Sequence, residues 1–231
     1  MRLNNSVSWS LVIPVKVLAV AKSRLTGLTR PRRAEIALAM AADTVLAAAA
    51  CAAVATVIVV TDDDGAAAEL SGLGALVLPD APGAGLNPAL AFGAAYSDKR
   101  WPGRGRAGMA ADLPALDAAG LDRALAEAAG LRQAFVADAA GTGTTLYAAG
   151  PGAAFCPRFG PGSFAAHLSA GAVELALHGI DGLRRDVDTV ADLRDAARIG
   201  LGPRTSVAAG SLEQPRADGS FPAQTPPDVR P

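Results

Sequence analysis

The chain has 231 residues, of which 51% are hydrophobic and 19% charged, which is enough for one domain with a sizeable core. Its formal net charge of -1 argues against a surface for nucleic acid or an anionic membrane. The two cysteines are too few for a disulfide framework and suit a reducing cytosol, and two histidines make a structural zinc site unexpected. We therefore expect a globular, cytoplasmic protein with small-molecule partners.

One uncharged stretch is almost long enough for a membrane span. Residues Thr44 to Thr61 carry no charge and approach the lower length limit for a spanning helix. Most of the stretch is alanine, which is only weakly apolar, and its end changes to Val57-Ile58-Val59-Val60, which is typical of a strand. The pattern predicts a helix followed by a strand, and no membrane association.

The first half of the chain alternates between apolar runs and helical segments. In chain order we expect a strand over Trp9–Val17, a basic loop over Lys16–Arg30, a helix from Pro31 to about Ala50, a strand over Val54–Val60, a short helix over Ala66–Leu70, a short strand over Ala75–Leu78 and a helix over Ala89–Tyr96.

The second half continues the alternation. We expect a basic loop over 98–106, a strand over Ala107–Ala111, a helix over Leu121–Ala129, strands over Ala134–Ala137 and Leu146–Ala149, and helices over Phe164–Leu177 and Val190–Ile199. The strand before Asp112 is poor in β-branched residues and is predicted from its context rather than from propensity.

The alternation predicts a three-layer α/β/α sandwich around a mostly parallel sheet. Right-handed crossovers place the carboxyl ends of parallel strands along one edge. Lys16, Asp62, Asp80 and Asp112 all fall at or just beyond such ends. We expect one domain over residues 1–202. Residues 203–231 are rich in proline with glycine and serine, which predicts a disordered tail without a catalytic part.

Two acidic positions are candidate metal ligands. Asp112 follows a predicted buried strand and precedes Leu113-Pro114, where open α/β sheets bind ligands. Asp186 and Asp188 alternate around Val187 and would share one face of a strand. Mg²⁺ prefers one or two carboxylates, with phosphate and water completing its shell. Alternatively, Asp112 caps the following helix, and Thr189 with Asp192 begins the last one.

Two glycine-rich loops are candidate anion sites. Gly141-Thr142-Gly143-Thr144-Thr145 combines permissive backbone with hydroxyl groups, and Phe159-Gly160-Pro161-Gly162-Ser163 precedes a predicted helix. A plain turn is the alternative for each. His167 lies four residues after Ser163, on the same helix face, with a satisfied surface histidine as the alternative.

The N-terminal basic segment carries three candidate phosphate-binding cations, Lys16, Lys22 and Arg24. An ordinary basic surface loop is the alternative, since neither a Walker P-loop nor a Rossmann fingerprint is present. In Gly85-Leu86-Asn87, the Asn87 amide would meet a base or ribose, or else cap the next helix.

Together these motifs resemble the phospholactate/phosphoenolpyruvate guanylyltransferases of coenzyme F420 biosynthesis, over about Leu11 to Gly202. The resemblance implies a Rossmann-type, GT-A-like nucleotidyltransferase with GTP as donor and Mg²⁺ as cofactor. Asp112 and Asp188 match metal-binding aspartates, and Lys16 matches a lysine near the nucleotide phosphates. Thr144, Gly160 and Ser163 match residues that hold a three-carbon phosphorylated acid.

The expected reaction joins phosphoenolpyruvate to GTP, giving enolpyruvyl-diphospho-5'-guanosine and pyrophosphate. The alanine-rich composition looks actinobacterial, and versions of the family there look specific for phosphoenolpyruvate. Phospholactate and 3-phosphoglycerate stay open as acceptors. A molybdenum-cofactor guanylyltransferase and a non-catalytic GTP-binding regulator are the rival functions. The sequence does not decide the oligomeric state and leaves a homodimer open.

Overall fold

The computed structural model describes residues 7–18, 22 and 24–213. Its strands are β1 (Trp9–Pro14), β2 (Val54–Val60), β3 (Leu76–Leu78), β4 (Gly105–Met109), β5 (Gln133–Ala137), β6 (Thr144–Ala149) and β7 (Val173–Glu174). Its helices are α1 (Arg30–Ala50), α2 (Asp64–Gly72), α3 (Leu86–Arg100), α4 (Ala118–Ala128), α5 (Ser163–Ser169), α6 (Asp181–Arg184), α7 (Val190–Ile199) and α8 (Pro203–Glu213).

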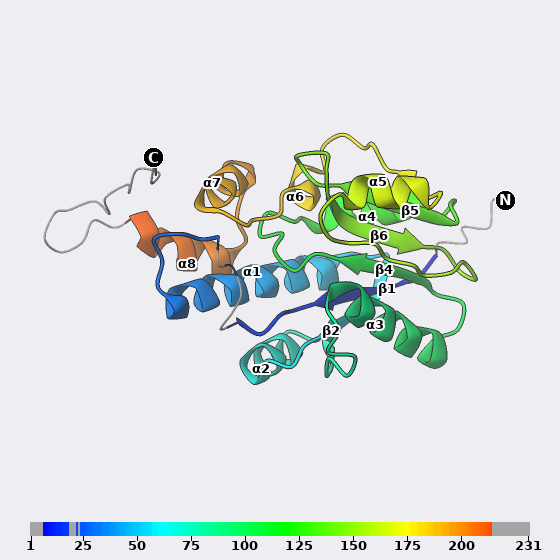
Figure 1. Ribbon diagram of the computed structural model, residues 1–231, viewed down its shortest axis with the longest axis horizontal. Coiled ribbons are helices and arrows are strands. Elements are labelled where there is room, and N and C mark those ends of the chain that lie inside the picture. Colours follow the sequence, from blue (N-terminus) through cyan, green and yellow to red (C-terminus); the bar gives the residue numbers. More distant parts are fainter. Residues whose placement is uncertain (1–6, 19–21, 23, 214–231) are drawn as a thin grey trace, which may run out of the picture.

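The described strands form one seven-stranded sheet in the order β3-β2-β1-β4-β6-β5-β7 (Figure 1). Strand β6 runs antiparallel to its neighbours β4 and β5, and the other pairs are parallel. The sheet is therefore mostly parallel, as predicted. Because β6 runs the opposite way, its first residue lies at the edge where β4 ends.

Helices cover both faces of the sheet, which confirms the three-layer architecture. On one face, α1, α2 and α4 contribute residues such as Val45, Leu70 and Leu125 to a core that includes Leu11 of β1. On the other face, Leu90 of α3 packs with buried residues of β1, β2, β5 and β6. Burial of these side chains is the main force that holds the layers together.

The predicted helix over Phe164–Leu177 is wrong in its length. Helix α5 ends at Ser169, and Gly171 follows with a left-handed φ of 85°, a conformation that glycine adopts without strain. The chain then forms β7, which pairs with β5. The short helix α6 was not predicted.

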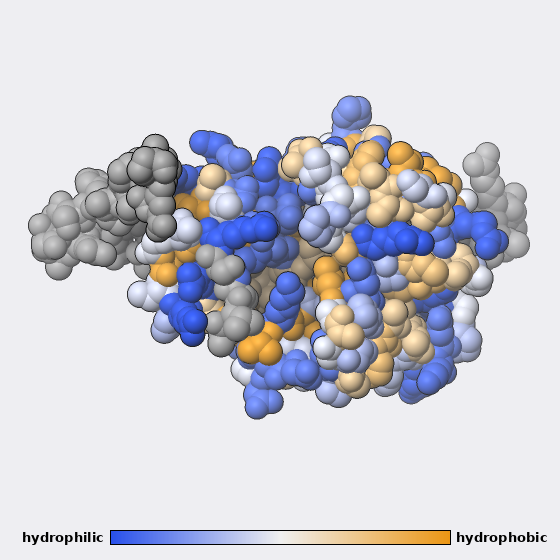
Figure 2. Space-filling model, in the orientation of Figure 1, coloured by the Kyte–Doolittle hydropathy of each residue, from blue (hydrophilic) through white to orange (hydrophobic). Residues whose placement is uncertain are grey.

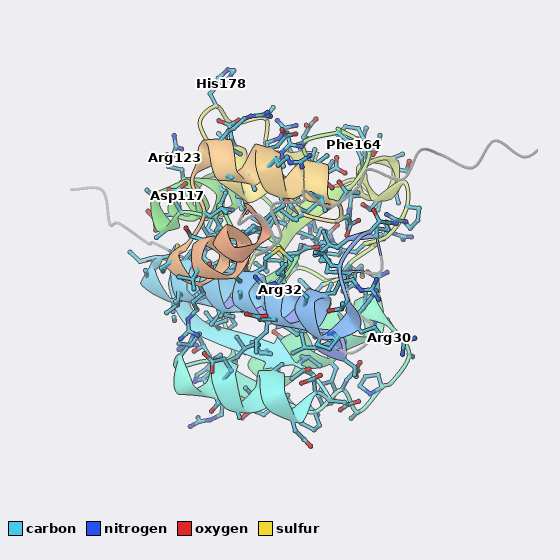
Figure 3. The ribbon with its side chains drawn as sticks, turned by 90° about the vertical axis from the view of Figure 1, so that its left-hand side faces the viewer. Arg30, Arg32, Asp117, Arg123, Phe164 and His178 are labelled. Atoms are coloured by element: carbon cyan, nitrogen blue, oxygen red, sulfur yellow. The ribbon has the colours of Figure 1, made fainter. Side chains whose placement is uncertain are left out.

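The predicted disorder from residue 203 is also wrong as far as residue 213, because Pro203–Glu213 forms α8. The buried carboxylate of Asp43 in α1 accepts hydrogen bonds from the backbone N–H groups of Arg204 (3.1 Å) and Thr205 (2.7 Å) at the start of this helix. Arg32 of α1 donates to the Ala208 carbonyl, and Figure 3 shows α8 lying against α1. Residues 214–231 lie outside the described part of the chain.

The basic loop predicted over 98–106 is largely regular structure. Helix α3 continues to Arg100, and β4 begins at Gly105. Arg106 is buried within β4, where it pairs with Asp98 over 3.1 Å and donates to the carbonyl of Gly150 over 3.3 Å. A basic residue is tolerated here because its charge is paired with Asp98 and its two terminal NH₂ groups donate to backbone carbonyls.

The stretch from Thr44 to Thr61 divides as predicted, with α1 ending at Ala50 and β2 beginning at Val54. Among the described helices, none is both long and apolar enough to cross a membrane.

Candidate active site

A cavity of about 690 Å³ opens at the carboxyl ends of β1 and β4. The chain moves outward from β1 to β2 and β3, then returns to place β4 on the other side of β1. Such a switch point leaves a crevice in which α/β proteins bind ligands. The cavity is lined by Lys16, Lys22, Arg24, Asp112, Asp138, Thr144, Gly160, Ser163, Asp186 and Asp188, among others. Its volume is ordinary for a small-molecule site.

Two backbone segments meet at the cavity. The N–H of Val187 donates to the carbonyl oxygen of Asp112 over 3.0 Å. The Val187 side chain is fully buried in a cluster with Leu25 and Leu193. Burial of Val187 leaves the aspartates on either side of it, Asp186 and Asp188, to line the cavity. This segment is a loop rather than the strand considered from the sequence, yet both carboxylates reach one site.

The segment that carries Asp112 is also held from α1. The buried hydroxyl of Thr44 accepts a hydrogen bond from the Leu113 N–H over 3.2 Å. Helix α6 approaches the other side so closely that a Cβ at Gly182 would collide with the Ala115 carbonyl. These contacts fix the backbone around Asp112, which is not a helix cap; Asp117 caps α4 instead.

One ammonium group joins the two predicted metal ligands. Lys22 Nζ donates to Asp112 Oδ2 and, over 2.9 Å, to Asp188 Oδ1. Arg24 adds a contact of 3.2 Å to Asp188 Oδ2. Burial lowers the pKa of Lys22, but Asp112 and then Asp188 raise it above the usual value overall, so the ammonium stays charged.

Asp188 is held at a helix start. Thr189 and Asp192 form a capping box at α7, and the Asp192 carboxylate also accepts the Asp188 N–H over 3.2 Å. Burial acts to raise the pKa of Asp188, yet the charges of Lys22 and Arg24 lower it overall. The helix-start alternative for Thr189 and Asp192 is therefore confirmed, and the same turn positions the Asp188 carboxylate.

The cavity lining is acidic overall. Of its described residues, three side chains are basic, and four are aspartates: Asp112, Asp138, Asp186 and Asp188. Burial and then the neighbouring Asp112 raise the pKa of Asp186 to about 6. Figure 2 shows hydrophilic side chains gathered over α7, on one side of this face of the molecule. A polyanionic ligand in this cavity would need additional cations to offset the carboxylates.

The Gly141–Thr145 loop is a tight turn between β5 and β6. Asp138 Oδ1 accepts the Thr142 N–H over 2.9 Å, and the Asp138 carbonyl accepts the Gly141 N–H over 3.1 Å. These two amides are therefore occupied by the turn itself. The loop places Thr144, the first residue of β6, in the cavity wall.

The Asn87 side chain is engaged by the protein backbone. Its Nδ2 donates to the Phe159 carbonyl over 2.9 Å, and its Oδ1 accepts the Phe159 N–H over 2.8 Å. The amide therefore fixes the start of the 159–163 loop, which places Gly160 and Ser163 in the cavity wall. The sequence does not reveal a backbone partner so distant along the chain, and a nucleotide contact of Asn87 stays a prediction.

His167 is fully buried rather than on the surface. Its Nδ1 lies 3.0 Å from Thr144 Oγ1, and its Nε2 accepts the Arg158 N–H over 2.9 Å. Burial lowers its pKa to about 4, against a smaller opposing effect of the Ser163 carbonyl. The imidazole is consequently neutral near pH 7.

Comparison with known proteins now assigns the family. Residues 9–202 match the family described as "Guanylyl transferase CofC like". This chain belongs to that guanylyltransferase family. A phosphoenolpyruvate guanylyltransferase of Thermomonospora curvata is 60% identical over 89% of this chain and 90% of its own length. That of Streptomyces scabiei is 52% identical over 89% of this chain and 98% of its own.

Solved structures agree with the fold expected for a CofC-like guanylyltransferase. A Desulfovibrio desulfuricans protein assigned as a nucleotide-diphospho-sugar transferase aligns with a TM-score of 0.60 at 14% identity, covering 83% of this chain and 96% of that one. A Methanothermobacter nucleotidyl transferase aligns with a TM-score of 0.53 at 19% identity, covering 83% and 97%. These likenesses concern the fold alone.

Two residues in the wall of the guanylyltransferase cavity were not candidates from the sequence. Asp138 directly follows β5, and Asp112 likewise lies just beyond the end of β4, so the strand-end rule could have identified Asp138. Asp186 was noted only as the neighbour of Asp188. Its burial depends on packing that no local pattern reveals.

Proposed function

We propose that this protein transfers a guanylyl group from GTP to phosphoenolpyruvate, giving enolpyruvyl-diphospho-5'-guanosine and pyrophosphate in coenzyme F420 biosynthesis. The two relatives named above are called phosphoenolpyruvate guanylyltransferases, and their identities reach 60% over most of the chain. The proposal for this chain further depends on the chemistry of its own cavity.

The observation that carries the proposal is the convergence of Asp112 and Asp188 on one cation. Lys22 Nζ marks a point within hydrogen-bonding distance of both carboxylates, inside the cavity at the switch point. Two carboxylate ligands, with phosphate and water for the rest, suit Mg²⁺. Within the described residues, no group of three or more metal-binding side chains occurs, so the reactants' phosphates would complete the shell.

In this proposal, Asp112 and Asp188 would hold Mg²⁺, which would supply positive charge to offset the charge of the phosphates. The acidic lining supports this requirement, because GTP and phosphoenolpyruvate are both polyanions. With Asp112 and Asp188 engaged by the metal, Lys22 would be free to face the triphosphate together with Lys16 and Arg24.

The reaction needs no covalent intermediate on the protein. A phosphate oxygen of phosphoenolpyruvate attacks the α-phosphorus in line, the new O–P bond forms, and the bond to the β-phosphate oxygen breaks as pyrophosphate leaves. The acceptor is already an anionic nucleophile. The side chains therefore act by alignment and by neutralising charge.

The acceptor would lie against Thr144, Gly160 and Ser163. Thr144 begins β6, Ser163 begins α5, Gly160 lies in the loop before α5, and all three line the cavity. Their small size leaves room for the ligand, and the two hydroxyl groups can donate to phosphate or carboxylate oxygens.

A pyrophosphate-release assay tests the proposal. GTP or ATP is offered with phosphoenolpyruvate, 2-phospholactate or 3-phosphoglycerate, and the fastest release is expected with GTP and phosphoenolpyruvate. Faster release with another acceptor would reassign the substrate. A protein that binds GTP but releases no pyrophosphate with any acceptor would instead be a regulator.

A further inference from the structure

The buried His167 has a fixed environment that determines which of its ring nitrogens carries the proton. The ring stacks on Tyr147 of β6, with centroids 4.8 Å apart, and on Phe135 of β5, at 5.6 Å. Phe159 meets it edge-on at 5.7 Å. These aromatic contacts leave the ring little freedom to rotate.

The hydrogen bonds then select the tautomer. The Arg158 backbone N–H can only donate, so Nε2, 2.9 Å away, must offer a lone pair. A neutral imidazole with a lone pair on Nε2 carries its proton on Nδ1. Nδ1 therefore has no lone pair and can only donate; Thr144 Oγ1 lies 3.0 Å from it, and the Ser163 carbonyl is the other acceptor that acts on the ring.

This donation determines the direction of the Thr144 hydroxyl. Its oxygen accepts from His167, so its own hydrogen must point elsewhere. In the part of the chain that the structure describes, the Thr144 hydroxyl has no hydrogen-bond partner besides His167. Thr144 also lines the cavity, where the hydroxyl hydrogen can meet a ligand oxygen.

We infer that His167 is a positioning residue that keeps the Thr144 hydroxyl as a hydrogen-bond donor toward an anionic oxygen of the acceptor. This inference rests on the proposed function for the identity of that acceptor. His167 touches neither reactant and acts through Thr144. It makes this side of the cavity selective for a ligand atom that accepts a hydrogen bond.

The tautomer is measured without turnover. In the full-length chain labelled with ¹⁵N-histidine, His178→Gln removes the signal of the exposed second histidine, which projects from the surface in Figure 3. We expect ¹⁵N shifts of the Nδ1–H tautomer that stay constant between about pH 5.5 and 8. An Nε2–H tautomer, or titration in that interval, would overturn the inference.

Two substitutions of His167 separate its two hydrogen bonds. In His167→Asn, the amide nitrogen stands as many bonds from Cβ as Nδ1 and can still donate to Thr144. In His167→Gln, the amide oxygen is as many bonds from Cβ as Nε2 is in histidine. It can accept the Arg158 N–H, while the donor to Thr144 is lost. Both variants are polar and lose the ring, so they control for packing.

The readout is the acceptor KM compared with the GTP KM. We expect His167→Gln and Thr144→Val each to raise the phosphoenolpyruvate KM about tenfold or more, as for a lost hydrogen bond to a charged group, with the GTP KM nearly unchanged. His167→Asn and Thr144→Ser, which each keep the donor, should raise the acceptor KM less than His167→Gln and Thr144→Val do. The double variant Thr144→Val/His167→Gln should match Thr144→Val alone, because both changes remove one interaction.

Additive effects in the double variant, or equal losses in His167→Asn and His167→Gln, would make His167 a packing residue and overturn the inference. If the variants do not fold, the ¹⁵N shifts of the His178→Gln protein still decide the tautomer. If the wild-type protein neither binds nor converts phosphoenolpyruvate, the proposed function fails, which the ¹⁵N shifts distinguish from a wrong tautomer.

Discussion

Val187 and Asp112 are joined by a backbone hydrogen bond of 3.0 Å, although they lie far apart in the sequence. The bond sets the segment between α6 and α7 beside the end of β4. Because the Val187 side chain is buried, the neighbouring Asp188 lines the cavity, where it meets Lys22 together with Asp112. The position of Asp188 in the site therefore depends on the burial of Val187 as well as on the charged side chains.

Loss of the Asp112 carboxylate should abolish most of the activity. We expect Asp112→Asn to lower turnover by about two orders of magnitude or more, because it removes a proposed metal contact. The measurement is pyrophosphate release with GTP and phosphoenolpyruvate. Asp62→Asn is the matched control, since Asp62 follows β2 but bonds to the Asp80 N–H instead. Near-normal release by a folded Asp112→Asn protein would contradict the role.

Substitution of Ser163 should affect acceptor binding but not nucleotide binding. It is the buried first residue of α5 and lines the cavity. Ser163→Ala should raise the KM for phosphoenolpyruvate about tenfold while changing the GTP KM much less, as expected for a lost hydrogen bond to an anion. Ser169→Ala, at the exposed other end of α5, should change neither. Equal increases in both KM values would remove Ser163 from the acceptor pocket.

Asn87 should contribute to stability rather than to base recognition. Its amide makes two hydrogen bonds to the Phe159 backbone, so Asn87→Ala should lower the free energy of unfolding by about 1–3 kcal/mol. Asn87→Asp keeps the acceptor and loses the donor, so its free energy of unfolding should lie between those of the wild type and Asn87→Ala. The preference for GTP over ATP should not change. A lost preference with unaltered stability would contradict this role and support the nucleotide contact predicted from the sequence.

Long, regular segments of the fold were predictable because their signals are local. The apolar run Val54–Val60 coincides with β2, and α1 begins within one residue of Pro31. The alternation of these segments was sufficient to predict the layers of the fold. The rule that ligands bind at the carboxyl ends of strands was sufficient to identify Asp112 as a candidate. Local composition wrongly predicted disorder at residues 203–213, because the carboxylate that caps this helix comes from Asp43 in another helix.

The candidate site was predictable as a set of residues but not as a set of contacts. Lys16, Lys22, Asp112, Thr144 and Asp188 all line one cavity. Which of them pair depends on how distant segments pack. No spacing along the sequence indicates that one ammonium bridges two carboxylates. The bonds made by Asn87 and His167 depend on packing in the same way.

The low pKa of His167 links it to the pH dependence of folding. Burial lowers the pKa to about 4 from an ordinary value of 6.5, so the unfolded chain binds the proton more tightly. The stabilising contribution is thus complete above about pH 6.5 and is lost as the pH falls toward 4. Arg158 and the Ser163 carbonyl are the groups that also act on this ring.

Urea unfolding at about pH 7 and pH 5 measures this contribution. Stability should fall less between the two pH values in His167→Asn than in the wild type. His178→Asn should behave like the wild type, because His178 is exposed. Asp186, whose pKa is raised to about 6, acts with the opposite sign in every variant and cancels in the comparison. Parallel losses in all three proteins would exclude a buried neutral His167.

Anomalous scattering from Mn²⁺, in crystals grown with GTP, tests the central claim most directly. The account predicts one peak at about 2.1–2.3 Å from a carboxylate oxygen of Asp112 and from one of Asp188, with Lys22 turned away toward the phosphates. A nucleotide-bound structure in which Lys22 still bridges the two carboxylates, with Mn²⁺ elsewhere, would contradict it.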